Sequence, residues 1–360
     1  MARPTQAVIN LQHLKDNYQL AKGYSQKAYA VIKADAYGHG LLPIAQALSD
    51  ADGLAVACMD EALQLRQHGI NNPILVLEGG YDEEEWLAAI EHDIEMVLHH
   101  QSQLAILLTK SHFKQIKLWL KIDTGMNRLG FRLNECHDIF QQCQHADLNI
   151  KVVMSHFACA DDLCHEKTLD QFQRLDEILQ LQKEFWPDLI LSSNNSAAII
   201  GWPEISDHIS RPGIMLYGSP PLIKKDKHDH LLKPVMTLKS QIIASHTVKA
   251  GETIGYGDSW VADKTTRVGI VAIGYGDGYP RSAPSGTPVW CQGSYLQTLG
   301  RVSMDMLCID ISEQTEINIG SEVELWGQYV NANEVASLCN TISYELFCQL
   351  TPRVKRVYKK

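Results

Sequence analysis

Short, strongly apolar runs alternate with segments of helical periodicity across about the first 220 residues. Runs this apolar predict strands that are buried on both faces, and their alternation with helices predicts βαβ units in a parallel sheet. Eight strands in this length predict a closed (β/α)8 barrel of the TIM type. The eight runs are AYAVIKADA, GLAVA, PILVL, EMVLH, IKLWLKID, IKVVMSHF, LILSSNN and ISRPGIMLYG.

Four segments have apolar residues three and four positions apart, the spacing of an amphipathic helix. They are NLQHLKDNYQLAK, LLPIAQALSD, MDEALQLRQHG and LDQFQRLDEILQLQKEF. An open doubly wound sheet is the alternative to the barrel. Its usual dinucleotide motif, G-x-G-x-x-G after the first strand, is absent, because the chain reads KADAYGHG there.

The pattern changes after a linker that runs from about Ser219 to Pro234. Beyond it, Gly and Pro turns separate runs with the period of strands, which predicts a second, mostly β domain. We therefore expect a barrel domain over residues 1–225 and a β-rich domain over residues 226–360. Within the second domain, residues 333–350 have helical spacing, and a basic tail follows from Arg353 to Lys360.

The charge balance argues against nucleic acid as a partner. Asp and Glu number 42 against 32 Lys and Arg, a net charge of −10, which repels a phosphate backbone. The basic tail is short, and such tails are usually solvated. The chain starts without a signal-peptide pattern, and no apolar run approaches the roughly 20 residues that cross a bilayer. We expect a cytoplasmic chain that contacts no membrane.

Neither the cysteines nor the histidines predict a metal site. The nine cysteines are scattered without a C-x-x-C pair, so reduced thiols are expected. His228 and His230 flank Asp229 within LIKKDKHDHLLKP, where a charged, flexible linker accounts for them better than metal ligation.

Polar residues follow several of the predicted barrel strands, and the active site of a TIM-type barrel forms at this end of the strands. Singly, each is typical of a surface charge or a packed histidine. Together on one rim they predict a site. They are Lys33, Asp123, Arg128, His156, Asn195, Ser196 and Arg211.

Lys33 fits the role of an imine-forming amine, since a partly desolvated lysine holds its proton less firmly. The backbone N–H groups of Gly213 and Ile214, with the hydroxyls of Tyr37 and Ser196, predict a phosphate-binding cup. A lysine beside such a cup suggests pyridoxal phosphate. The alternative is a cofactor-free lyase, in which the lysine would form its imine with a sugar phosphate.

Eight motifs in both predicted domains resemble those of bacterial alanine racemases: AVIKADAYGHG, KIDTGMNRLGF, SHFACAD, NNSAAI, RPGIMLYG, IGYGDSW, IGYGDGYPR and GRVSMDM. The resemblance implies a fold-type III pyridoxal phosphate enzyme that interconverts L- and D-alanine and supplies D-alanine for peptidoglycan. It also implies a head-to-tail homodimer with shared active sites. A racemase of broader specificity is the alternative; decarboxylases and a non-catalytic carrier with the same barrel fit less well, because carriers lack a second domain.

Racemisation needs one base on each face of the α-carbon. Lys33 resembles the lysine that binds the cofactor covalently and serves the D-enantiomer. Tyr256 resembles the opposing base, which serves the L-enantiomer and comes from the partner subunit. On spacing alone, Tyr256 reads as a packed tyrosine in a Gly-rich turn.

Four further barrel residues resemble groups that tune these bases. Arg211 resembles the arginine that faces the pyridine nitrogen, and His156 the residue that orients it. Arg128 resembles the arginine that binds the phenolic oxygen of the cofactor and orients Tyr256. Lys121 resembles a lysine that many members carry as a carbamate, which steadies this arginine.

The remaining implied contacts lie around the cofactor and the substrate. Met304 resembles the residue whose backbone N–H binds the substrate carboxylate, together with Arg128. One departure is Pro352, which replaces a tyrosine that donates to the cofactor phosphate in some relatives. The implied cofactor-binding residues also include Tyr37, Asn195, Ser196, Gly213 and Ile214, and the implied entrance residues are Tyr275, Arg281, Arg301 and Asp305.

Overall fold

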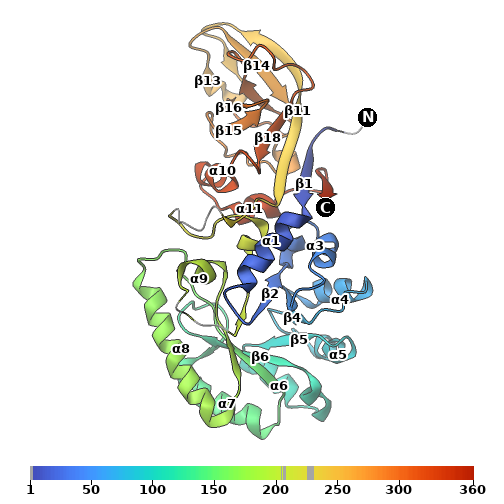
Figure 1. The fold of residues 1–360 in the computed structure, drawn as a ribbon, viewed down its shortest axis with the longest axis vertical. Helices are drawn as coiled ribbons and strands as arrows, with labels where there is room; N and C mark the ends of the chain where they lie inside the picture. The colour runs from blue at the N-terminus through green and yellow to red at the C-terminus, as the bar shows by residue number, and fades with distance from the viewer. Residues whose placement is uncertain (1–2, 204, 206–207, 225–230) are drawn as a thin grey trace.

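The computed structural model describes residues 3–203, 205, 208–224 and 231–360. Figure 1 shows two bodies, a barrel surrounded by helices and a β-rich domain beyond one end of it. The predicted barrel followed by a β domain is confirmed. The segment with His228, Asp229 and His230, interpreted above as a linker, lies outside the described residues. Within the described part, no helix is long and apolar enough to span a bilayer.

All eight predicted barrel strands are present, and every neighbouring pair is parallel. The sheet does not close by a regular ladder between its two edge strands, but the Arg211 amide donates to the Asn194 carbonyl across that gap at 2.9 Å. In sheet order the strands are β10 (Ile209–Ser210), β2 (Lys27–Val31), β3 (Gly53–Val56), β4 (Ile74–Val76), β5 (Glu95–Leu98), β6 (Leu118–Asp123), β8 (Ile150–Met154) and β9 (Ile190–Ser192). A two-residue strand, β7 (Phe131–Arg132), also pairs with β6.

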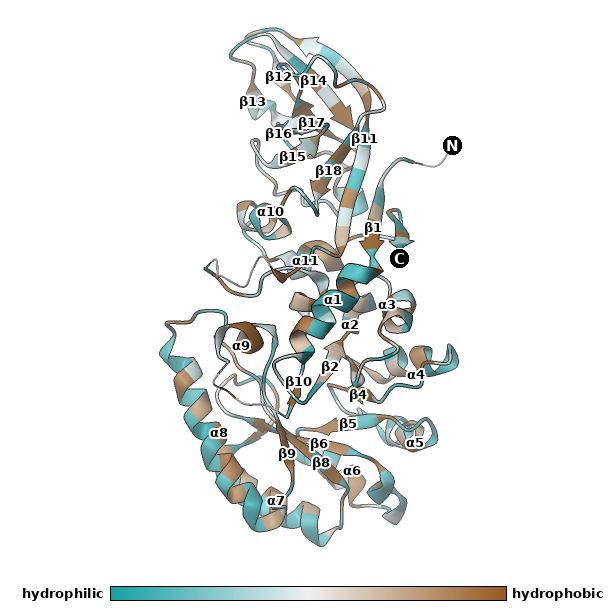
Figure 2. Ribbon diagram, in the orientation of Figure 1, coloured by the Kyte–Doolittle hydropathy of each residue, from teal (hydrophilic) through white to brown (hydrophobic). Residues whose placement is uncertain are grey.

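Helices of moderate length connect the strands around the outside of the barrel (Figure 1). Several begin at side chains that accept a hydrogen bond from the first turn, as Asp82 does from the Glu85 amide. Most of them carry apolar residues toward the barrel and polar residues outward, whereas the last one is apolar almost throughout (Figure 2). They are α1 (Leu11–Lys22), α3 (Leu41–Ala47), α4 (Met59–Gln67), α5 (Glu83–Glu91), α6 (Gln101–Leu107), α7 (Cys136–His145), α8 (Glu166–Phe185) and α9 (Ser196–Gly201).

The β domain is built around one long strand, β11 (Met236–Val248), which is antiparallel to three neighbours. A bulge between Ile242 and Ala244 bends it, so that different parts of its length pair with different strands. The other strands are β12 (Thr253–Ile254), β13 (Trp260–Val261), β14 (Thr266–Val271), β15 (Pro288–Cys291), β16 (Ser294–Leu299), β17 (Leu307–Asp310) and β18 (Glu322–Trp326). Two helices, α10 (Ala332–Leu338) and α11 (Ser343–Cys348), occupy the segment with helical spacing.

Both ends of the chain belong to the sheet of the β domain. β1 (Gln6–Asn10) pairs antiparallel with β11 and parallel with β19 (Lys355–Lys359). Figure 1 shows the two terminal strands side by side at the junction of the bodies. The basic tail, expected to be solvated, is instead a strand paired with β1. The barrel is inserted between the first strand of this sheet and the rest.

Polar and aromatic side chains meet inside the barrel, near the beginnings of β5 and β6. Tyr29 and Trp119 lie on strands that are not neighbours, and their ring centroids are 5.1 Å apart. Glu95 is buried beside them and accepts a hydrogen bond from Trp119 Nε1 at 2.8 Å. Gly53 makes room for this cluster, because a Cβ at that position would overlap the Tyr29 ring.

Glu95→Gln should gain stability relative to the wild type as the pH rises from 5 to 8. Burial raises the pKa of Glu95 above its ordinary value of 4.5, so the stability it contributes is present at low pH and is lost as the pH rises through the folded-state pKa. Glutamine is neutral throughout and keeps an acceptor for Trp119. Thermal unfolding at several pH values checks this, with the exposed Glu313→Gln as the control. A variant whose stability relative to the wild type falls as the pH rises would contradict the prediction.

Candidate active site

Lys33 is the first residue of α2 (Lys33–Gly38), directly after β2. The next four residues, 34–37, are in the left-handed region with φ between +52° and +54°, a conformation that costs L-residues roughly 1–2 kcal/mol each. Surrounding groups hold this turn in place: Glu61 accepts from the Ala34 amide and Asp35 from the Leu41 amide, both at 2.7 Å. Strain of this kind persists only where neighbours over-determine it, and it is concentrated at functional sites.

A cavity of about 960 Å³ opens at the carboxyl ends of the barrel strands. Its lining brings together side chains that follow β2, β6, β8, β9 and β10, in agreement with the strand-end argument. All nine cofactor-binding residues expected in the barrel, and Lys121, line it. They are Lys33, Tyr37, Lys121, Arg128, His156, Asn195, Ser196, Arg211, Gly213 and Ile214.

The cavity holds an excess of basic groups, and this controls their protonation. Burial, reinforced by the charge of Arg128, lowers the pKa of Lys33. Burial together with Arg211 and Arg128 lowers the pKa of Lys121 to about 7. Burial also lowers the pKa of His156 well below its ordinary value, so its ring is neutral. Two amines that shed their protons readily therefore lie close to arginines that do not.

Arg211 is nearly fully buried, and its guanidinium is held from the barrel side. It donates to the Ser192 hydroxyl, to the Ser155 carbonyl at 2.5 Å and to the Ser193 carbonyl at 3.4 Å. These contacts fix the direction in which the charge faces. His156 Nε2 lies 3.4 Å from the Asn195 amide nitrogen, and the expected contact between His156 and Arg211 stays a prediction.

The residues of the expected phosphate cup lie against one another. The Ser196 hydroxyl accepts from the Gly213 amide at 2.8 Å and from the Met215 amide at 3.3 Å. A Cβ at Gly213 would lie 2.6 Å from Tyr37 Oη, so any residue other than glycine would collide with that hydroxyl. Tyr37 is in turn stacked on Tyr217 at 4.7 Å. Two hydroxyls and backbone N–H groups on one small patch fit an anion with several oxygens.

Part of the cavity lining was not expected from the sequence. Glu78 follows β4, so the argument from strand ends would have found it. Tyr344 and Cys348 come from α11, and no local signal connects that helix with the barrel rim. Asp123, considered as a strand-end candidate, instead shapes the loop that leads to Arg128. It accepts from the Gly125 and Asn127 amides at 2.9 and 3.1 Å.

Tyr256 and Met304 do not line the cavity of their own chain among the described residues. Their side chains are 69% and 52% exposed, on loops of the β domain. The remaining expected residues of this domain lie on the same or adjoining loops: the Tyr275 amide donates to the Ser303 carbonyl at 3.0 Å. Arg301 lies against Gly257, next to Tyr256. Arg281 is exposed, and Asp305 follows Met304.

Known proteins match this chain over nearly its whole length. The model of the alanine racemase N-terminal domain matches residues 9–221, and that of the C-terminal domain matches residues 235–358. The alanine racemase of Pseudomonas syringae pv. syringae (strain B728a) is 46% identical over 364 residues, which cover 99% of each chain.

Two solved structures share the fold over nearly their whole length. The biosynthetic alanine racemase from Pseudomonas aeruginosa has a TM-score of 0.93 and 39% identity, covering 99% of this chain and 100% of that one. The alanine racemase from Bartonella henselae with covalently bound pyridoxal phosphate has a TM-score of 0.89 and 28% identity, covering 99% of each chain.

Proposed function

The chain belongs to the alanine racemase family and interconverts L- and D-alanine; on that premise we propose that Lys33, with Tyr256 of a second copy of the chain, moves the α-proton. The observation that carries the proposal is the cavity itself, where Lys33 lies with the eight other barrel residues expected around the cofactor. Its lowered pKa suits an amine that gives up its proton more readily than an exposed lysine does.

The cofactor of this site is pyridoxal phosphate. When bound, it supplies an aldehyde for the amine and a conjugated ring that withdraws electrons from the α-carbon of the amino acid. The residues present fit it: Lys33 is partly desolvated, and Ser196, Gly213 and Tyr37 form an anion cup. The bound cofactor of the Bartonella henselae relative supports the same assignment.

Arg211 controls how strongly the ring withdraws electrons. A guanidinium keeps its protons in a protein and can only donate, so a ring nitrogen that faces Arg211 accepts a hydrogen bond and stays unprotonated. A neutral ring delocalises charge less than a pyridinium, which limits transamination and other side reactions. The three hydrogen bonds that hold Arg211 preserve this orientation.

Tyr256 acts across a subunit boundary. Its side chain is 69% exposed and lies outside its own chain's cavity, so it serves as a base only where another molecule presents it. A head-to-tail homodimer meets this need, because a two-fold axis gives each cavity the β domain of the other copy. Arg128 of the cavity then orients the partner's tyrosine.

Substrate binding is shared in the same way. The Met304 backbone N–H, presented by the partner, and Arg128 bind the carboxylate of alanine. Tyr275, Arg281, Arg301 and Asp305 line the entrance to the site, and bulky and charged side chains there favour a small amino acid.

Lys121 carries a carbamate. A pKa of about 7 leaves much of this amine neutral near physiological pH, and only the neutral amine combines with carbon dioxide. The product is an anion, which Arg128 and Arg211 stabilise. Mass measurement of the native protein, made with and without bicarbonate, should show the gain of one carbon dioxide that Lys121→Met prevents. An unmodified wild type in bicarbonate would overturn the assignment.

The activity is tested by incubating the purified protein with pyridoxal phosphate and L-alanine, L-serine or L-lysine, followed by chiral separation. We expect D-alanine to form fastest; comparable racemisation of lysine would identify the broader-specificity enzyme. A protein that stays colourless with pyridoxal phosphate and forms no D-amino acid would overturn the proposal. The cellular role is cytoplasmic supply of D-alanine to peptidoglycan, and expression in a D-alanine auxotroph should restore growth.

A further inference from the structure

We propose that Arg3 and Arg353, from opposite ends of the chain, are positioning residues for two loops of the β domain and thereby set the affinity for alanine. The two loops, residues 274–278 and 303–306, are called here the paired loops. They carry Tyr275 and Met304. The inference rests on the proposed function, in which these loops complete the cavity of a second copy.

The paired loops behave as one unit. The Tyr275 amide donates to the Ser303 carbonyl at 3.0 Å, and the Gly276 amide to the Met304 carbonyl at 2.8 Å. A Cβ at Gly274 would overlap the Ser303 carbonyl, so the two backbones are as close as glycine allows. Any group that fixes one loop therefore fixes the other, including the backbone N–H of Met304.

Asp277 anchors the first of the paired loops from the inside. Its side chain is fully buried, and its Oδ2 accepts from Arg3 Nη2 at 2.7 Å and from the Gly274 amide at 3.0 Å. Its Oδ1 accepts no hydrogen bond from any described residue, but Arg353 Nε lies 3.2 Å away. A buried carboxylate is costly without cationic partners, so the two arginines determine where this loop can lie.

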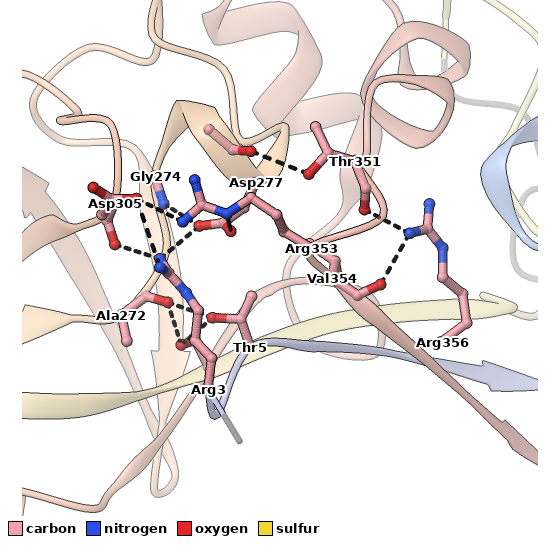
Figure 3. Close-up of polar contacts among 12 residues, drawn as sticks. Arg3, Thr5, Ala272, Gly274, Asp277, Asp305, Thr351, Arg353, Val354 and Arg356 are labelled. Atoms are coloured by element: carbon pink, nitrogen blue, oxygen red, sulfur yellow. Dashed lines mark hydrogen bonds and ion pairs between the residues drawn. The ribbon is translucent and has the colours of Figure 1, made fainter. Parts of the chain in front are cut away.

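The same two arginines reach the second of the paired loops (Figure 3). Arg3 Nη2 donates to the Asp305 carbonyl at 2.6 Å, and Arg353 Nη2 donates to Asp305 Oδ1 at 2.5 Å. This hydrogen bond to Arg353 lowers the pKa of Asp305, so its carboxylate stays ionised at neutral pH. Each arginine thus contacts both loops. The two arginines, with the carboxylates of Asp277 and Asp305 that they bind, are called here the clamp.

The clamp also joins the paired loops to the cavity of their own chain. Thr351 donates to the Asp277 and Gly276 carbonyls, each at 3.1 Å, through its amide and its hydroxyl. A few residues earlier, Tyr344 and Cys348 line the cavity. Residues 344–351 therefore line the cavity of their own chain and also support the paired loops, which complete the cavity of the second copy. Because Met304 is 52% exposed, the position of the paired loops depends on their contacts with Arg3, Arg353 and Thr351.

The test is steady-state kinetics of Arg353→Ala, Arg3→Ala and the double variant, as purified holoenzyme, in both directions of racemisation. With the clamp released, Met304 no longer holds its place. We expect KM for alanine to rise on the order of tenfold, as for the loss of one charge-assisted hydrogen bond, with kcat within about threefold of the wild type. Arg353→Lys should be intermediate, since an ammonium cannot bridge two carboxylates as a guanidinium does.

Binding of propionate gives a readout independent of turnover, because propionate has the carboxylate of alanine without the amine. Its affinity by calorimetry should fall by the same factor as KM rises. Arg267→Ala is the matched control: this arginine lies in the same domain but donates to the Gln314 and Ile317 carbonyls, away from the paired loops. Its KM and its propionate affinity should match those of the wild type.

Unchanged KM and propionate affinity in the double variant would overturn the proposal. So would a parallel fall of kcat, dimer content and bound cofactor, which indicates a general structural role. If Arg353→Ala does not fold, Arg353→Lys and Arg3→Ala are judged by the same criteria. An inactive wild-type holoenzyme would instead overturn the proposed function, and the two failures are thus distinguished.

Discussion

Replacing Lys33 by alanine should reduce racemisation of alanine by at least about 10³-fold in both directions, since a general base contributes roughly 10²–10⁴ and this residue also forms the covalent link. The wild-type protein should be yellow with pyridoxal phosphate, and borohydride should bleach it while fixing the cofactor to the peptide that contains position 33. The variant should bind the cofactor without that fixed link. Chiral chromatography measures the first effect, and peptide mass mapping the second.

Lys117→Ala is the matched control, because Lys117 pairs with Asp93 on the barrel surface and contributes nothing to the cavity lining. It should keep wild-type activity and colour. Borohydride fixation at another lysine, or an active Lys33→Ala protein, would refute the assignment. Retained folding, checked by circular dichroism, separates loss of the amine from loss of the left-handed turn behind it.

Tyr256→Phe should lower racemisation by roughly 10²–10⁴-fold, because the phenyl ring cannot carry the proton on the second face. The variant should nevertheless exchange the α-proton of D-alanine with heavy water without inversion, since Lys33 still serves that enantiomer. Exchange is followed by NMR. Tyr295→Phe is the control, as Tyr295 is another exposed tyrosine of the β domain, bonded to the Tyr329 carbonyl.

Mixing the inactive Lys33→Ala and Tyr256→Phe proteins tests whether the site is shared. If the subunits re-assort at random, half of the dimers are mixed, and each mixed dimer has one site with both bases. About a quarter of the wild-type activity should return. A site contained within one chain would give no recovery, which would contradict the proposal that Tyr256 acts from the partner subunit.

The barrel could be predicted from the sequence because its strands are buried on both faces. Such strands read as continuous apolar runs, and all eight runs correspond to strands. The two terminal strands could not be predicted in the same way. QAVIN and KRVYK are short, and the second is largely charged. Their pairing joins residues about 350 positions apart, a relation that no local periodicity records.

The residues of the candidate site also fall into two groups, those that the sequence could predict and those that it could not. Barrel residues such as Lys33 and Arg211 follow strands, so fold class alone places them at one rim. Tyr256 has no such marker, and only the resemblance to a family singled it out. The pairing of Asp277 with Arg353 could not be predicted, because each is an ordinary charge in the sequence and their contact depends on the tertiary fold. The left-handed turn was equally hidden, since the alanines at 34 and 36 do not favour positive φ.

The insertion of the barrel between β1 and the rest of its sheet has a consequence for biosynthesis. β1 is synthesised before the barrel, yet its partner β11 begins only at Met236, which at 5–20 residues per second is a delay of roughly 10 to 45 seconds. Its second partner, β19, is synthesised later still. The barrel has time to form before β1 pairs, so the pairing of β1 with β11 and β19 belongs to the last step of folding rather than the first.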